Sequence, residues 1–147
     1  MTLARYAYEY SFTRRRIADA PRDRLDLPEL TAAFLAPLYK GEERETLRVV
    51  LLDRKHKVMG VETVYRGTVS GTPVRLAEFF TAAVRLNASG IILAHNHPSG
   101  DPSPSADDVR TTREAASAGR LLDIELVDHI ILGEDSWRSM RRDGMLA

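Results

Sequence analysis

The sequence has 147 residues, a length that fits a single domain, and its net charge is zero because 21 lysines and arginines balance 21 acidic residues. The balanced charge gives no overall attraction for nucleic acid, and the absence of cysteine excludes disulfides and thiolate metal ligands, which leaves histidine and carboxylate. No apolar run is long enough to span a bilayer and no apolar signal segment begins the chain, so we expect a cytoplasmic protein with no membrane partner.

Residues 1–24 differ from the rest of the chain, because they contain six arginines and only three acidic residues. Aromatic residues alternate with other residues between Tyr6 and Phe12, a period-two pattern that is typical of an edge strand. A basic, aromatic arm could bind nucleic acid or an acidic partner, but a solvated terminal extension is the simpler interpretation. We therefore expect an N-terminal extension over residues 1–24 and one domain over residues 25–147.

Helical and strand patterns alternate through the predicted domain. Pro28 lies at a typical first helical position, and Leu30, Phe34 and Leu38 follow at helical spacing. Interleaved helices and strands predict an α/β or α+β sandwich around a mixed sheet. The expected helices are 28–39, 74–87 and a third from Ser105 to about Gly119, and the expected strands are 47–53, 57–65, 91–97 and 123–132.

The most informative pattern lies between His95 and Asp108. A short apolar run predicts a buried strand that leads directly into His95, and side chains two apart on a strand share a face, so His95 and His97 should point the same way. Pro98 ends the strand because it cannot donate to the ladder. After a proline-rich loop, Ser105 opens a helix that brings Asp108 back at the end nearest the histidines.

Two imidazoles and one carboxylate predict an open zinc site. Catalytic zinc typically has three protein ligands and a water, whereas structural zinc has four protein ligands. Taken alone, Ser105 with Asp107 and Asp108 would be only a good helix start, and a lone His-x-His would more often be packing or surface. The combination after a buried strand favours His95, His97 and Asp108 as metal ligands, with Asp107 pointing elsewhere on the helix.

A zinc hydrolase also needs a general base, and Glu62 is our candidate. It lies in a strand whose two faces are both mostly apolar, where a carboxylate is costly unless it is paired or used. The alternative is a glutamate at a sheet edge with its carboxylate in water. We interpret three other upstream acids as a solvated boundary before a strand: Glu42, Glu43 and Glu45.

Ser105 and His129 each have two possible roles. Ser105 could donate a hydrogen bond to the oxyanion of a tetrahedral intermediate, or it could only cap the helix. His129 lies in an apolar strand, where a core histidine satisfied by a neighbour is the usual explanation. A role in orienting a metal ligand is the alternative.

The spacing His95-x-His97, seven residues, then Ser105-x-x-Asp108 matches the JAMM (MPN+) metalloenzyme motif at every fixed position. The surrounding residues resemble the catalytic-type domain of RadC-like proteins, chiefly at 91–102 and 128–133. The resemblance implies an MPN fold, with helices around a mixed sheet as in cytidine deaminases, and a Zn²⁺-dependent hydrolase of peptide or isopeptide bonds. It also implies a catalytic glutamate on an early strand, followed within a few residues by glycine, which Glu62 and Gly67 satisfy.

One departure from the resembled family concerns the N-terminus. RadC proteins usually carry a helix-hairpin-helix region associated with DNA, and the segment before Leu25 is too short to hold one. Three functions remain open at this point. A zinc metalloprotease or isopeptidase with a peptide or protein substrate is favoured over a RadC-type DNA-repair accessory protein, and over a noncatalytic MPN scaffold.

Overall fold

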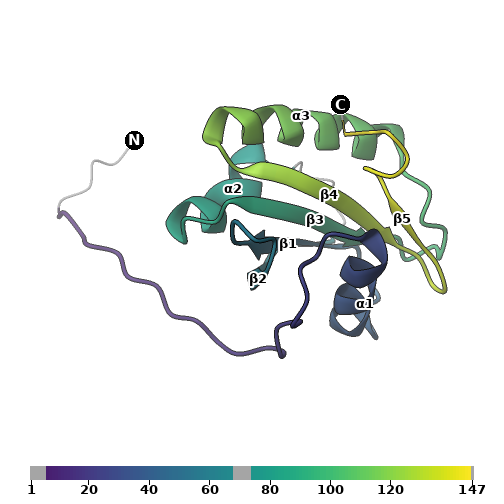
Figure 1. Ribbon diagram of the computed structural model, residues 1–147, viewed down its shortest axis with the longest axis horizontal. Helices are drawn as coiled ribbons and strands as arrows, with labels where there is room; N and C mark the ends of the chain where they lie inside the picture. Colours follow the sequence, from purple (N-terminus) through teal and green to yellow (C-terminus); the bar gives the residue numbers. More distant parts are fainter. Residues whose placement is uncertain (1–5, 68–73, 147) are drawn as a thin grey trace.

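The computed structural model describes residues 6–67 and 74–146, and it is built around one five-stranded sheet (Figure 1). The strand order is β2-β1-β3-β4-β5, and all neighbouring strands are antiparallel except β3 and β4, which are parallel. The predicted α+β class with a mixed sheet is confirmed. The strands are β1 (Thr46–Leu52), β2 (Val58–Arg66), β3 (Gly90–Asn96), β4 (Glu125–Leu132) and β5 (Trp137–Ser139).

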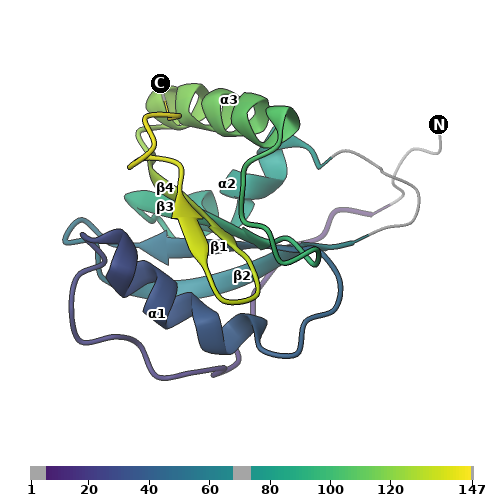
Figure 2. The ribbon, with the colours of Figure 1, turned by 90° about the vertical axis from the view of Figure 1, so that its right-hand side faces the viewer.

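Helices cover both faces of the sheet, so the domain has three layers. Figure 2 shows α1 (Pro28–Tyr39) below the sheet and both α2 (Leu76–Arg85) and α3 (Ala106–Leu122) above it. Strand alternation divides β3 between two hydrophobic cores. Ile91 and Leu93 pack with α2 and α3, whereas Ile92 and Ala94 pack with α1.

The central position of β3 in the sheet fixes the place of the side chains at its end. Every residue of β3 is buried, and α3 connects it to its parallel neighbour β4. The carboxyl end of β3 and the amino end of α3 are joined by a short loop. The chain therefore brings the end of a rigid strand close to the first turn of a helix.

The boundary of α3 differs from the sequence expectation. The helix continues through Gly119 to Leu122 and turns at Asp123, whose φ is 56°. Gly119 is a packing residue, because a Cβ there would lie 2.3 Å from the backbone oxygen of Ile124. We expected Gly119 to end the helix. Its lack of a side chain instead lets α3 pack closely against the segment that contains Ile124.

The predicted helix over 28–39 is confirmed, and its buried face is centred on Thr31, Leu35 and Tyr39. Phe34 and Leu38 pack at the edge of the same core, whereas Leu30 is 37% exposed. Tyr39 is tolerated there because its hydroxyl lies within hydrogen-bond distance of two backbone carbonyls. Residues 6–24 form neither helix nor strand and are mostly exposed, so the alternating aromatic residues do not form an edge strand and the segment is an extension, the simpler interpretation of its sequence. Among the described residues, no helix is both long and apolar enough to cross a membrane.

Candidate metal centre

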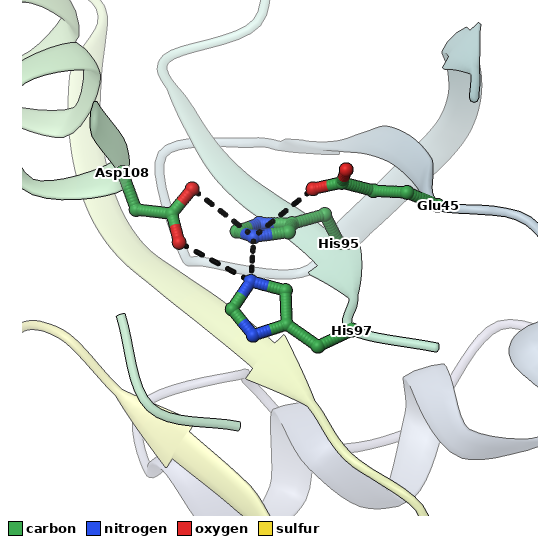
Figure 3. A group of neighbouring side chains, drawn as sticks. All are labelled: Glu45, His95, His97 and Asp108. Carbon is green, nitrogen blue, oxygen red and sulfur yellow. Dashed lines mark hydrogen bonds and ion pairs between the residues drawn. The ribbon is translucent and has the colours of Figure 1, made fainter. Parts of the chain in front are cut away.

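Strand alternation directs the two predicted histidine ligands to one side of the sheet. His95 shares the face of Leu93, toward α3, and is only 3% exposed. His97 follows the end of β3, and its side chain is more open. Figure 3 shows both rings turned toward the carboxylate of Asp108. The structure thus brings together the three residues that the motif predicts as ligands.

Asp108 is oriented by the start of α3. Its backbone N–H donates to Ser105 Oγ at 3.0 Å, and its Oδ2 accepts from the Ser105 N–H at 2.9 Å, which forms a reciprocal capping box. Partial burial raises the pKa of Asp108, but the neighbouring His95 and the hydrogen bonds with Ser105 outweigh it and hold that pKa well below its usual value. The cap therefore presents an ionised carboxylate. Asp107 points elsewhere, is exposed, and pairs with Arg110.

The spacing of the three ligand groups fits one zinc ion. Two ligand atoms that each lie about 2.0–2.1 Å from a tetrahedral zinc are about 3.3 Å from each other. His95 Nε2 lies 3.0 Å from His97 Nε2 and 3.3 Å from Asp108 Oδ1. His97 Nε2 lies 3.2 Å from Asp108 Oδ2. The three separations are close to the edge of such a tetrahedron, with the two histidines facing different oxygens of the Asp108 carboxylate, so the residues fit the metal that the motif implies.

The loop after β3 fixes the ring of His97. Nδ1 of His97 lies 2.9 Å from the backbone oxygen of Asp101, and because a carbonyl can only accept, Nδ1 carries the proton. The lone pair of Nε2 is then free to bind a cation. The loop is held close to the β4–β5 turn, where a Cβ on Gly133 would lie 2.3 Å from the oxygen of Gly100.

A fourth side chain, Glu45, completes the cluster. Its Oε1 lies 3.7 Å from His95 Nε2, and the ligand atoms of all four residues lie within 4.8 Å of one another. Figure 3 shows the carboxylate approaching His95 from the side opposite Asp108. Because Glu45 is about half exposed and farther away than a tetrahedral edge, its position suits a group beside the open position of a metal rather than a ligand.

Strand register explains why Glu45 reaches the site. Leu47 lies opposite His95 in the antiparallel β1–β3 pair, so Glu45, two residues earlier, meets the end of β3 beside His97. The backbone on either side of Glu45 is held by Asn96, which accepts from the N–H of Thr46 and donates to the carbonyl of Arg44.

Gly67 adds a second constraint on Glu45, because its N–H donates to the backbone oxygen of Glu45 and a Cβ there would lie 3.1 Å from that oxygen. The glycine that the resemblance associates with a catalytic glutamate therefore lies beside the glutamate of the cluster. That glutamate comes before β1, however, and not from β2.

The structure does not bring Glu62 to the cluster, which corrects the choice of Glu62 as the residue beside the metal. Glu62 is on β2 opposite Val49, which in turn lies opposite Leu93. The residue aligned through β1 with His95 is Tyr65. A whole strand therefore separates Glu62 from β3. Glu45 was missed from the sequence because residues 42–45 were interpreted as a solvated, charged segment before a strand. Only the pairing of β1 with β3 shows that this segment lies next to the histidines.

His129 is buried directly behind the site. It is 2% exposed, and its Nε2 lies 2.7 Å from His95 Nδ1, on the side of that ring away from Asp108. Burial lowers the pKa of His129 well below its ordinary value, and His95 lowers it further. Burial therefore favours the neutral form of the ring. Its Nδ1 lies 2.7 Å from the hydroxyl of Thr112.

An open groove of about 1300 Å³ lies between α1 and the β4–β5 turn. Of the four clustered residues, His97 alone lines it, together with its neighbours Asn96 and Pro98. The acidic residues that line the groove include Glu42, Glu43, Glu134 and Asp135.

The chain is similar to known proteins over most of its length. The family model described as a RadC-like JAB domain matches residues 25–145. A UPF0758 protein of Chloroflexus aurantiacus is 43% identical over 143 residues, which is 97% of this chain and 58% of that protein. A UPF0758 protein of Symbiobacterium thermophilum is 42% identical over 133 residues, which is 89% of this chain and 57% of the relative.

The chain thus spans somewhat more than half the length of these two relatives. The match covers the sheet, all three helices and the four clustered side chains. The resemblance noted from the motif spacing is confirmed, and the chain belongs to the family of RadC-like JAB domains.

Proposed function

We propose that this domain is a zinc-dependent hydrolase that cleaves a peptide or isopeptide bond. The observation that carries the proposal is the tetrahedral spacing of His95, His97 and Asp108, with the Glu45 carboxylate 3.7 Å from His95 Nε2. Three ligands and a nearby base are the arrangement of a catalytic zinc site rather than of a closed structural one. The JAMM-type motif supports amide bonds as the substrate class.

Zinc held by these three residues would supply Lewis acidity, which lowers the pKa of a water to about 7 and polarises a carbonyl. Glu45 is the general base in this proposal, because it accepts the proton of the attacking water and returns it to the leaving amine. Its half-exposed position allows both transfers. The hydroxyl of Ser105 accepts from Asp108 N–H in the capping box, so its own proton is free to stabilise the oxyanion.

The groove beside His97 supports a peptide or protein substrate, because it is open, has a volume of about 1300 Å³ and is lined by one of the proposed metal ligands. Its carboxylates would attract cationic side chains, although Glu42 is already paired with Arg48. A substrate screen should therefore include lysine- and arginine-containing peptides and isopeptide-linked pairs.

The proposal is tested with two matched glutamate variants. On any peptide that the zinc-loaded protein cleaves, chelation should abolish turnover and added zinc should restore it. Glu45→Gln should lower turnover by about 10² to 10⁴, whereas Glu62→Gln should leave it unchanged. Equal turnover in wild type and Glu45→Gln would overturn the assignment of the base. Turnover that persists after complete metal removal would overturn the metal mechanism.

A further inference from the structure

The hydroxyl of Thr112 has two close polar partners, with the sulfur of Met140 farther away at 3.4 Å. Its Oγ1 lies 2.6 Å from the backbone oxygen of Asp108 and 2.7 Å from His129 Nδ1. A hydroxyl has one proton to donate, and the carbonyl of Asp108 can only accept, so that proton goes to Asp108. The hydroxyl must then accept from His129, which places the proton of His129 on Nδ1.

The same assignment of protons extends to His95, the proposed metal ligand. A neutral imidazole with its proton on Nδ1 has only a lone pair on Nε2. His129 Nε2 lies 2.7 Å from His95 Nδ1, so His95 must donate and must carry its own proton on Nδ1. The Nε2 lone pair of His95 then faces His97 and Asp108.

We propose that Thr112 and His129 are positioning residues that hold His95 in the tautomer able to bind a metal. This inference rests on the metal site of the proposed function but not on hydrolysis. Both residues are buried, Thr112 completely, so water does not compete for their hydrogen bonds. The opposite tautomer of His129 would donate to His95 Nδ1 and force a proton onto His95 Nε2, where it would block the metal.

The hydrogen-bonded chain from Thr112 through His129 to His95, which we call the relay, also links the proposed ligands His95 and Asp108. Thr112 comes from the second turn of α3, and it bonds the backbone of Asp108 as well as the ring that orients His95. A ligand on the helix and a ligand on β3 are thus held by one hydroxyl. Outer partners of this kind typically contribute 10- to 100-fold to metal affinity.

The test compares zinc affinity in three threonine variants. Thr112→Val keeps the shape but removes the hydroxyl, and we expect zinc to bind 10- to 100-fold more weakly. Thr112→Ser keeps a hydroxyl and should bind within about threefold of wild type. Thr31→Val is the matched control, because Thr31 is also a buried helix threonine bonded to the carbonyl four residues earlier, but on the opposite face of the sheet. Unchanged affinity in folded Thr112→Val would overturn the proposal.

A second measurement uses metal-free wild-type protein. Nitrogen-15 NMR of the histidine side chains should show the proton on Nδ1 in both His95 and His129. A proton on His95 Nε2 instead would overturn the relay even if Thr112→Val cannot be purified. Neither readout needs a substrate, so the relay can hold in a protein that cleaves nothing, and it can fail in an active hydrolase.

Discussion

The side-chain oxygen of Asn96 accepts a hydrogen bond from the backbone N–H of Thr46 at 2.7 Å. Asn96 is the middle residue of the His-x-His motif, and its side chain points to the face opposite His95. Its amide nitrogen donates to the carbonyl of Arg44 at 3.0 Å. The strand that bears the histidines therefore also holds the backbone on both sides of Glu45, so the candidate ligands His95 and His97 and the proposed base are positioned by one element.

Replacing Asn96 tests this coupling. Asn96→Ala leaves the buried N–H of Thr46 without a partner, so the free energy of unfolding should fall by about 1–3 kcal/mol. Zinc stoichiometry should persist because no ligand is removed, while turnover should fall because Glu45 loses its support. Asn96→Asp retains the acceptor and should recover part of the stability. Denaturant unfolding and metal analysis measure both effects, and a fully stable Asn96→Ala would contradict the argument.

Metal content distinguishes the ligands from the base. We expect about one zinc per chain in wild type, as for a single site with three protein ligands. His97→Ala and Asp108→Ala should lose the metal, whereas Glu45→Gln should retain it, because Glu45 lies beyond the tetrahedral spacing. Elemental analysis after dialysis decides the point. Full zinc in both ligand variants would refute the site, and loss of zinc in Glu45→Gln would make Glu45 a ligand.

Two substitutions of Ser105 separate its capping role from its proposed role at the oxyanion. Ser105→Ala removes the cap and should cost about 1 kcal/mol of stability, whereas Ser105→Gly should cost only a few tenths. Both remove the hydroxyl proton, so both should lower turnover by a similar factor. If turnover falls in the alanine variant alone, Ser105 is only a cap.

The dependence of stability on pH should report the burial of Asp128. Burial raises the pKa of this carboxyl, and the hydrogen bond from Ser139 only partly opposes the shift. The folded state therefore holds its proton more tightly than the unfolded state does. The resulting stability is present below the unfolded pKa and is lost as pH rises through the folded pKa.

Comparison with Asp128→Asn isolates this contribution. The variant cannot release a proton, so the difference in unfolding free energy between metal-free wild type and variant should shift in favour of the variant as pH rises above about 4. Denaturant titrations at a series of pH values measure that difference. A constant difference across the acidic range would mean that burial does not perturb Asp128.

Residues 95–108 were enough to predict the three candidate ligands and their convergence, because a buried strand, a proline-rich loop and a capped helix are local structures. Alternation places His95 and His97 on one face, and the capping residue Ser105 sets Asp108 one turn into α3. The main helices and strands were likewise predicted to within a few residues. These features depend on neighbours in the chain, which the sequence displays directly.

Only the tertiary structure decided the rest of the site. Glu45 lies fifty residues before His95 and reaches it because β1 pairs with β3, whereas Glu62 stays one strand farther out on β2. His129 lies behind His95 because β4 is the parallel neighbour of β3. Strand order and register join residues distant in sequence, and no local pattern of hydrophobicity or charge specifies which strand pairs with which.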